Sequence, residues 1–277
     1  MTLTTKQKNI LAQLSTDRDF ATPGEPTRTY VICCNHRTGS NLLSEALYRT
    51  GVAGDPIEYF NLGFIREFCR TRGHNQLPLF RYLEEMRQRR TSPNGVFGMN
   101  IKFDQVRLAF QNDPDVAERL LYRNDAHIFL YRRNKLKQAI SAYKGQVRGV
   151  FNVVDGQSGE PSNQDAEVPF DPARIIRNLN SQSWIDEEWL AFFKKHGISY
   201  YSVAYEDLVD HYEFYIRDIL RYIGVDARDV AIPTKPTVKI GNAEDDALAR
   251  AFLGHLDPDG GYLASAADAN RRASRQA

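Results

Sequence analysis

The stretch that decides the fold reads Tyr30-Val31-Ile32-Cys33-Cys34, Asn35-His36-Arg37-Thr38-Gly39 and Ser40-Asn41-Leu42-Leu43-Ser44-Glu45-Ala46-Leu47-Tyr48-Arg49-Thr50. Its first part is a continuous β-prone apolar run, typical of a strand that is buried on both faces. Its last part places apolar side chains on one helical face, and Gly51 follows as a residue that commonly ends a helix. A strand, a glycine-containing turn and a helix in this order predict the first half of a βαβ unit.

The rest of the chain repeats this alternation. Apolar runs predict further strands at 95–103, 126–131 and 199–205, and helical text lies at 135–144 and 175–196. Apolar strands that alternate with helices predict an α/β fold with a central, mostly parallel sheet flanked by helices on both faces.

The length of 277 residues fits one large domain better than two independent ones. We expect a polar N-terminal arm over residues 1–27, a single domain over 28–262 and a flexible, polar tail over 263–277. Two insert loops interrupt the domain: 61–94 is charged and helix-prone, and 148–172 is rich in glycine, proline and polar residues. A long loop of the second kind inside a compact domain is usually mobile or functional.

Charge and composition exclude several classes of protein. A net charge of +1 provides no general attraction to nucleic acid or to an acidic membrane surface, so an anion would have to bind at a local positive cluster. The three cysteines are too few and too poorly spaced for a disulfide framework or a zinc site. The N-terminus lacks an apolar signal region, and no apolar run approaches the about 20 residues of a membrane span. We therefore expect a cytoplasmic protein without a metal, a nucleic-acid partner or an integral membrane segment.

The turn after the first strand is a candidate anion site. A helix that begins there exposes unpaired backbone N–H groups and the positive end of its dipole. Arg37 adds a fixed charge, and Gly39 would let the backbone approach phosphate oxygens closely. Further donors are available from Thr38, Ser40 and Asn41. The turn is neither a GxxxxGK[ST] nor a GxGxxG motif, and an ordinary capped helix start is the alternative interpretation.

Two quoted segments together resemble a known family. The run Arg37-Thr38-Gly39-Ser40-Asn41-Leu42-Leu43 resembles the 5′-phosphosulfate loop of sulfotransferases that use 3′-phosphoadenosine-5′-phosphosulfate (PAPS), and Gly51-Val52-Ala53-Gly54-Asp55-Pro56-Ile57-Glu58-Tyr59-Phe60 resembles the Stf0 type in particular. The resemblance runs from about residue 30 to about residue 252. It implies a three-layer, sulfotransferase-like P-loop fold. It also implies PAPS as the sulfuryl donor, adenosine 3′,5′-bisphosphate (PAP) as the product, and a hydroxyl of a carbohydrate or glycolipid as the acceptor.

The 3′-phosphate of PAPS requires a second positive pocket. Arg132 and Arg133 leave the strand at 126–131, and Ser141 follows on the next helix, a pattern similar to the sulfotransferase 3′-phosphate motif. Arginine suits phosphate because its planar fork donates two charge-assisted hydrogen bonds. The pattern leaves open which arginine reaches the phosphate. Lys239, in the segment 236–242, is a third candidate because the resemblance places a loop over the 3′-phosphate there.

Sulfuryl transfer to a hydroxyl requires a group that takes the hydroxyl proton and positive groups that meet charge on the leaving phosphate. The resemblance implies Glu58 as the general base, and none of the six histidines displaces it; Arg37 is the candidate for the leaving group. Burial among aromatic residues is expected to raise the proton affinity of Glu58. Many Stf0-like sequences carry a lysine after the glycines of the second strand, and here Asn100 stands near that place with Lys102 on the same face. Either residue could take that role.

The acceptor is not identified by the sequence. Proximity along the chain to the expected site makes four residues substrate candidates: Tyr59, Phe60, Tyr143 and Arg148. The resemblance permits a homodimer. Two other function classes stay open, namely a nucleotide-binding module without transfer activity and a P-loop-type kinase. The missing loop lysine and the lack of an evident Walker B aspartate disfavour the kinase.

Overall fold

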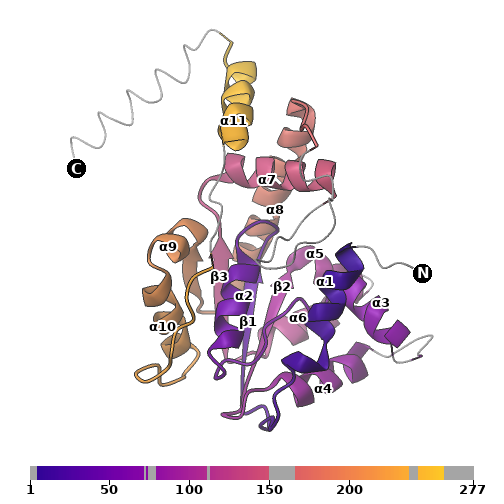
Figure 1. Cartoon of the computed structure of the whole chain (residues 1–277), viewed down its shortest axis with the longest axis vertical. Helices are drawn as coiled ribbons and strands as arrows, with labels where there is room; N and C mark the ends of the chain where they lie inside the picture. The colour runs from indigo at the N-terminus through magenta and orange to yellow at the C-terminus, as the bar shows by residue number, and fades with distance from the viewer. Residues whose placement is uncertain are drawn as a thin grey trace.

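A four-stranded parallel sheet lies at the centre of the computed structural model, which describes residues 5–71, 73, 79–110, 113–149, 166–236 and 243–258 (Figure 1). The strand order is β2-β1-β3-β4. The strands are β1 (Arg28–Cys34), β2 (Val96–Lys102), β3 (Ala126–Tyr131) and β4 (Tyr201–Ala204). The predicted α/β class and parallel sheet are thus confirmed.

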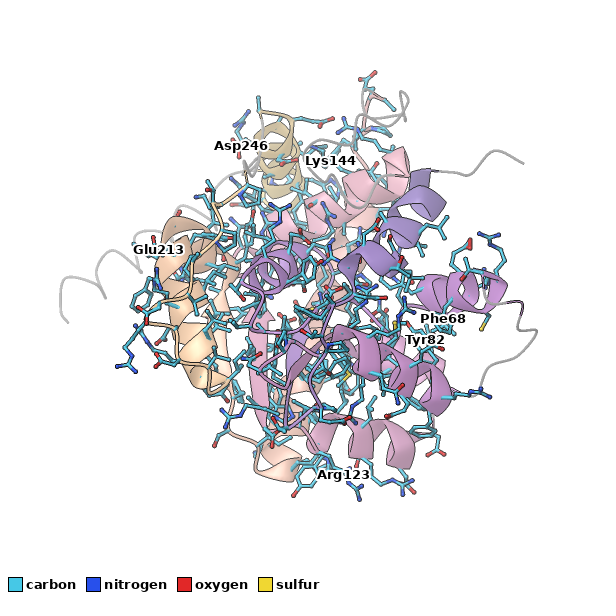
Figure 2. All side chains as sticks on the ribbon, turned by 60° about the horizontal axis from the view of Figure 1, so that its bottom comes forward. Phe68, Tyr82, Arg123, Lys144, Glu213 and Asp246 are labelled. Carbon is cyan, nitrogen blue, oxygen red and sulfur yellow. The ribbon has the colours of Figure 1, made fainter. Side chains whose placement is uncertain are left out.

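Helices connect and cover the strands. Those described are α1 (Thr5–Leu14), the 3-10 turn η1 (Thr16–Arg18), α2 (Ser40–Arg49), α3 (Leu62–Thr71), α4 (Leu79–Arg90), α5 (Phe103–Ala109), α6 (Pro114–Tyr122), α7 (Lys135–Arg148), α8 (Pro172–His196), α9 (Tyr205–Asp210), α10 (Tyr212–Tyr222) and α11 (Ala243–Leu256). The first insert therefore contains two helices, α3 and α4, whose rings Phe68 and Tyr82 meet edge to face at 4.9 Å (Figure 2). Most of the second insert lies outside the described residues.

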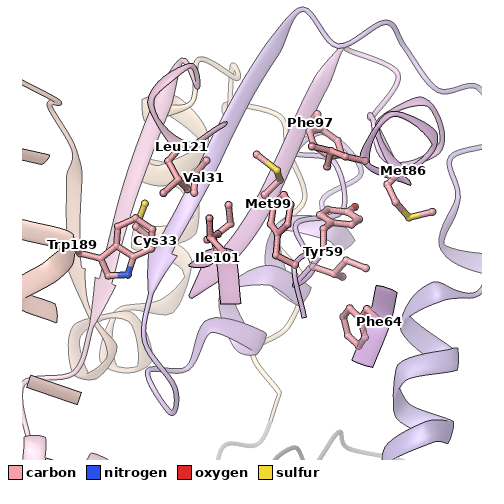
Figure 3. Close-up of a cluster of buried hydrophobic side chains, with 14 of the residues drawn as sticks. Val31, Cys33, Tyr59, Phe64, Met86, Phe97, Met99, Ile101, Leu121 and Trp189 are labelled. Carbon is pink, nitrogen blue, oxygen red and sulfur yellow. The ribbon is translucent and has the colours of Figure 1, made fainter. Parts of the chain in front are cut away.

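The two faces of the sheet bury two different cores. Alternate side chains of a strand point to opposite faces, so Val31 and Cys33 of β1 enter one core while Ile32 enters the other. Figure 3 shows the first core, in which Val31 and Cys33 lie near Trp189 of α8. The second core is covered by α2 and α10. Helices on both faces complete the three layers (Figure 1).

The register brings the carboxyl ends of three strands to one edge. Cys34 at the end of β1 is level with Lys102 of β2 and with Leu130 of β3. Because the chain crosses from β2 on one side of β1 to β3 on the other, β1 is the point where the strand order reverses. Ligands of open α/β sheets bind outside the carboxyl ends of strands at such a point.

The N-terminal segment is held to the domain by a buried ion-pair network. From the sequence we expected a polar arm there, but none of these ion pairs. Asp55 accepts hydrogen bonds from Arg18 Nε at 3.0 Å and Nη2 at 2.7 Å, and it pairs with Arg90. Arg90 is fully buried and also contacts Asp19 at 2.8 Å. Ile10 of α1 joins the first core. The segment thus packs on the domain because Arg18 and Asp19 pair with charged residues more than 30 positions later in the chain.

Candidate active site

The loop that follows β1 contains two residues in the left-handed region. Arg37 has φ 65° and Gly39 has φ 79°, and α2 begins directly afterwards at Ser40. Thr38 is fully buried and donates its hydroxyl to the carbonyl oxygen of Asn35 at 2.8 Å. The Asn35 amide in turn donates to the carbonyl oxygen of Gln182 in α8 at 2.8 Å. The loop is therefore held by a hydrogen bond within it and by one to α8.

Gly39 is required by the tertiary packing as well as by its φ angle. A Cβ atom built there would lie 2.4 Å from Cδ2 of Tyr205, at the start of α9. We expected the missing Cβ to let the backbone approach phosphate; in the structure that space is filled by the Tyr205 ring. The same ring lies 5.0 Å from the Arg132 guanidinium. Tyr205 thus packs against both the loop and Arg132 at the end of β3.

Arg37, Ser141 and Arg132 converge beside the loop. Arg37 Nε donates to Ser141 Oγ at 3.0 Å, and Arg132 Nη1 reaches the carbonyl oxygen of Arg37 at 3.4 Å. Burial lowers the pKa of both guanidinium groups, and the positive charge of Arg132 lowers that of Arg37 further. Arg132 Nε is buried without a hydrogen-bond partner in the described part of the chain. The nearest counter-charge to Arg132 Nε is Glu206 Oε1, at 3.9 Å, which is beyond hydrogen-bond distance. Two partly buried like charges side by side, one of them with a donor that makes no hydrogen bond, have the character of an anion site.

Arg133 points elsewhere. Its side chain is 52% exposed and forms an ion pair with Asp207 of α9. The backbone N–H groups of Arg133 and Asn134 donate to the two carboxylate oxygens of Glu206, each at 3.1 Å. Adjacent residues leave a strand on opposite sides, so only Arg132 faces the loop.

Glu58 lies in a cradle of donors rather than in an apolar environment. Its carboxylate forms an ion pair with Lys102 and accepts hydrogen bonds from Gln105 at 2.8 Å and from Asn61 at 3.2 Å. Burial by itself raises the pKa of Glu58, but Lys102 and these amides lower it to about 2. The expected rise in proton affinity is therefore wrong, because the charged partners outweigh the loss of water. The carboxylate is ionised at neutral pH.

Lys102, and not Asn100, faces Glu58. The Asn100 amide donates to Ser44 Oγ at 3.2 Å in α2, and its carbonyl oxygen lies 3.1 Å from Cys34 Sγ. Asn100 therefore links β2 to α2. Lys102 is two residues further along the same face and is nearly fully buried at the end of the strand.

A third group of charges joins α7 to α11. Lys144 of α7, one turn after Ser141, contacts Glu244 and Asp245 at 2.6 Å each, and Lys137 pairs with Asp246 at 2.9 Å. Lys144 and Asp246 mark this contact in Figure 2. It holds the first turn of α11 against the helix that carries Ser141.

The four substrate candidates and Lys239 lie as follows. Tyr59 and Phe60 are fully buried in the first core, and the Tyr59 hydroxyl donates to the Asp55 carbonyl at 2.6 Å. Tyr143 is buried in the core beneath α7, with its hydroxyl donating to the Pro169 carbonyl at 2.5 Å. Arg148 pairs with Glu244 at 2.7 Å. Lys239 lies outside the described residues.

Sequence reasoning missed Gln105 and the His36–Asp104 pair. His36 Nε2 lies 3.1 Å from Asp104 Oδ2. Burial by itself raises the pKa of Asp104, but the contact with His36 and the charge of Lys102 together lower it. Asp104 and Gln105 stand just after β2, beside the end of β1, so the parallel pairing of these strands was the signal available in the sequence.

In the described ranges, the His, Cys, Asp and Glu side chains form no group of three that could hold a metal ion. None of the helices described is both long enough and apolar enough to cross a membrane.

Most of the chain matches the model of one protein family. A family model described as Stf0 sulphotransferase matches residues 29–252. The trehalose 2-sulfotransferase of Mycobacterium tuberculosis (strain ATCC 35801 / TMC 107 / Erdman) is 25% identical over 243 residues, with 74% of this chain and 88% of the relative covered. The trehalose 2-sulfotransferase of Mycolicibacterium smegmatis (strain ATCC 700084 / mc(2)155) is 23% identical over 233 residues, with 72% and 85% covered. Among solved structures, the sulfotransferase domain from the Synechococcus PCC 7002 olefin synthase aligns at a TM-score of 0.38 and 15% identity, covering 84% of this chain and 98% of that one.

Proposed function

Because the chain belongs to the Stf0 sulphotransferase family, we propose that it transfers a sulfuryl group from PAPS to a hydroxyl of a carbohydrate or glycolipid by in-line displacement. The observation that carries this proposal is the convergence of Arg37, Arg132 and Ser141 beside the loop after β1. Arg37 and Arg132 are adjacent, partly buried cations that disfavour each other. An anion between them would reduce this repulsion and would accept a hydrogen bond from Arg132 Nε.

The residues present suit a nucleotide with anionic groups at both ends. The start of α2, with the N–H groups of Gly39, Ser40 and Asn41, would hold the 5′-phosphosulfate end. Arg132 and Ser141 would hold the 3′-phosphate, and Lys239 of the segment 236–242 would add to that end. Arg133 is left out because it is committed to Asp207. PAPS supplies the sulfuryl group and leaves as PAP.

Glu58 is the general base in this proposal. It is ionised and it is partly exposed, so it can accept the proton of an acceptor hydroxyl. Its low pKa makes it a weak base, so its main contribution is to hold that hydroxyl and receive the proton as the sulfur–oxygen bond forms. Arg37 and the loop amides stabilise the charge on the departing phosphate. No covalent enzyme intermediate is required.

A carbohydrate acceptor is supported by the names of the relatives, both described as trehalose 2-sulfotransferases. Tyr59, Phe60 and Tyr143 do not enter the proposal, because their side chains are buried in the cores. Arg148 is left out as well, since its guanidinium is held by Glu244. The cytoplasmic location and the homodimer stay predictions.

Thermal unfolding with nucleotides tests the donor site. PAP at a concentration well above its Kd should raise the Tm, whereas ATP at the same concentration should not. Protection by ATP and not by PAP would favour the kinase. Transfer is tested separately with PAPS and a panel of sugars that includes trehalose. PAP binding without transfer to any sugar or glycolipid, for wild type and Glu58→Gln alike, would identify a nucleotide-binding module.

A further inference from the structure

The carboxamide of Gln105 has an orientation that stability alone does not explain. Gln105 stands in the first turn of α5, is 8% exposed, and donates Nε2 to Glu58 Oε2 at 2.8 Å. An ionised carboxylate only accepts hydrogen bonds, so the amide must turn its NH2 group toward Glu58 and its carbonyl oxygen away. That carbonyl oxygen is buried, and the described residues supply no donor to it. A buried acceptor without a donor costs free energy, which a side chain selected only for packing would avoid.

The contact defines which part of the Glu58 carboxylate stays available. Lys102 occupies Oε1, while Gln105 and Asn61 both donate to Oε2. A carboxylate has about four lone-pair sites, so these contacts leave one, on Oε1. Among the described residues, Asn61 at 3.2 Å is the only other amide that donates to Oε2. Without Gln105, the Glu58 carboxylate could therefore rotate about the Cγ–Cδ bond.

The charged surroundings of this pair come from three elements. Lys102 faces Glu58 from β2, Cys34 lies within electrostatic range on β1, and Asp104 acts on Lys102 from α5. His36 contacts Asp104 from the loop after β1. The Gln105 amide is uncharged, so it can orient Glu58 without changing the net charge of the site.

We propose that Gln105 is a positioning residue, which holds the Glu58 carboxylate so that one oxygen lone pair faces the acceptor hydroxyl. The proposal rests on the proposed function of Glu58 as the base. It adds a residue whose amide contacts neither the donor nor the acceptor and acts only through Glu58.

The first test is Gln105→Met, which keeps the length of the side chain and removes the amide. Because the orphaned carbonyl disappears with the lost hydrogen bond, the Tm should change by less than about 2 °C. The kcat should fall about tenfold, while KM for PAPS and for the acceptor should change less than about twofold. The matched control is Gln88→Met, because Gln88 is an exposed glutamine whose amide lies 3.4 Å from Glu84. Its kinetics should equal those of wild type. An unchanged kcat in Gln105→Met, or a lower Tm with kcat and KM altered together, overturns the proposal.

The second test does not depend on activity. Gln105→Glu places a second carboxylate against Glu58, and two carboxylates that share a site hold a proton more strongly than one. Carbon-13 NMR of the glutamate carboxyl groups should therefore show the titration of Glu58 moving upward from about 2. Gln88→Glu, beside exposed Glu84, should leave it unchanged. If the Glu58 titration is the same in Gln105→Glu as in wild type, the positioning contact does not exist. Full activity of Glu58→Gln would instead contradict the proposed base, and it would leave the NMR result on the contact standing.

Discussion

Lys102, at the end of β2, forms a buried ion pair with Glu58, which lies 44 positions earlier in the chain, between α2 and α3. This pair explains why a carboxylate largely shielded from water still has a pKa of about 2. It also links stability to pH, because the proton affinity of Glu58 differs between the folded and the unfolded chain.

Glu58→Gln should destabilise the fold at neutral pH. The folded pKa lies below the usual 4.5, so the pair stabilises the fold above that pH and the contribution disappears as the pH falls toward 2. The loss at pH 7 should be roughly 3 kcal/mol. Urea unfolding at pH 7 and at pH 3 measures it. The difference between wild type and variant should shrink at the lower pH, and the double variant with Lys102→Met should recover stability. A difference that does not depend on pH would contradict the ionised pair.

The choice between two adjacent arginines can be tested directly. Arg132→Ala should weaken PAP binding at least about tenfold, because it removes a charge-assisted donor from the anion site. Arg133→Ala is the matched control, since its guanidinium is committed to Asp207 at the surface. Calorimetric titration with PAP compares the two. Equal weakening by both substitutions would mean that Arg132 has no special place in the site.

Gly39→Ala should be more costly than Gly51→Ala, although both glycines have positive φ angles of 79° and 73°. At Gly51 a Cβ atom meets nothing within 4 Å, so only backbone strain of about 1 kcal/mol is expected. At Gly39 the same atom collides with the Tyr205 ring, and a further loss of about 1–3 kcal/mol should follow. Chemical denaturation gives both values. Gly39→Ala should also lose stabilisation by PAP, and retention of it would show that the loop tolerates displacement of Tyr205.

Asp55→Asn, which replaces a buried carboxylate by an amide of nearly the same size, should strongly destabilise the fold. It leaves Arg90, which is fully buried, without its main counter-charge, and it weakens the hold on Arg18. Breaking a buried ion pair from one side costs roughly 3–5 kcal/mol. The control is Asp226→Asn, whose partner Arg228 is exposed, and which should leave the Tm unchanged. Limited proteolysis should also cleave the N-terminal segment faster in Asp55→Asn. An unaltered cleavage rate would show that α1 is held by apolar contacts alone.

Elements with a strong local pattern were predictable from the sequence. The run at 126–131 coincides with β3, and the predicted helix from residue 40 ends before Gly51 as expected. The helix predicted over 175–196 begins earlier, at Pro172, because Asp171 caps it and accepts a hydrogen bond from the Arg174 N–H at 3.0 Å. Because the capping residue directly precedes the helix, the correct start of α8 could have been predicted from the sequence.

The candidate site could be predicted only as a set of residue types. The loop at 36–41 and Glu58 stood out because motif residues are adjacent in the chain. The protonation of Glu58 was predicted in the wrong direction because its partners Lys102 and Gln105 come from another strand and helix. The placement of Tyr143 and Arg148 near the site rested on chain proximity, and helix α7 directs them into a core and a salt bridge.

The sequence by itself determined that a glycine-containing turn and a helix start follow a buried central strand, because hydrophobic periodicity, glycine and helix capping act over a few residues. Only the tertiary structure decided that Arg132 rather than Arg133 faces that turn, that Lys102 rather than Asn100 meets Glu58, and that Gly39 must make room for Tyr205. Hydrogen bonds, ion pairs and pKa values depend on distances of a few ångströms between atoms. Those distances are set by strand register and helix packing across tens of residues, which no local pattern contains.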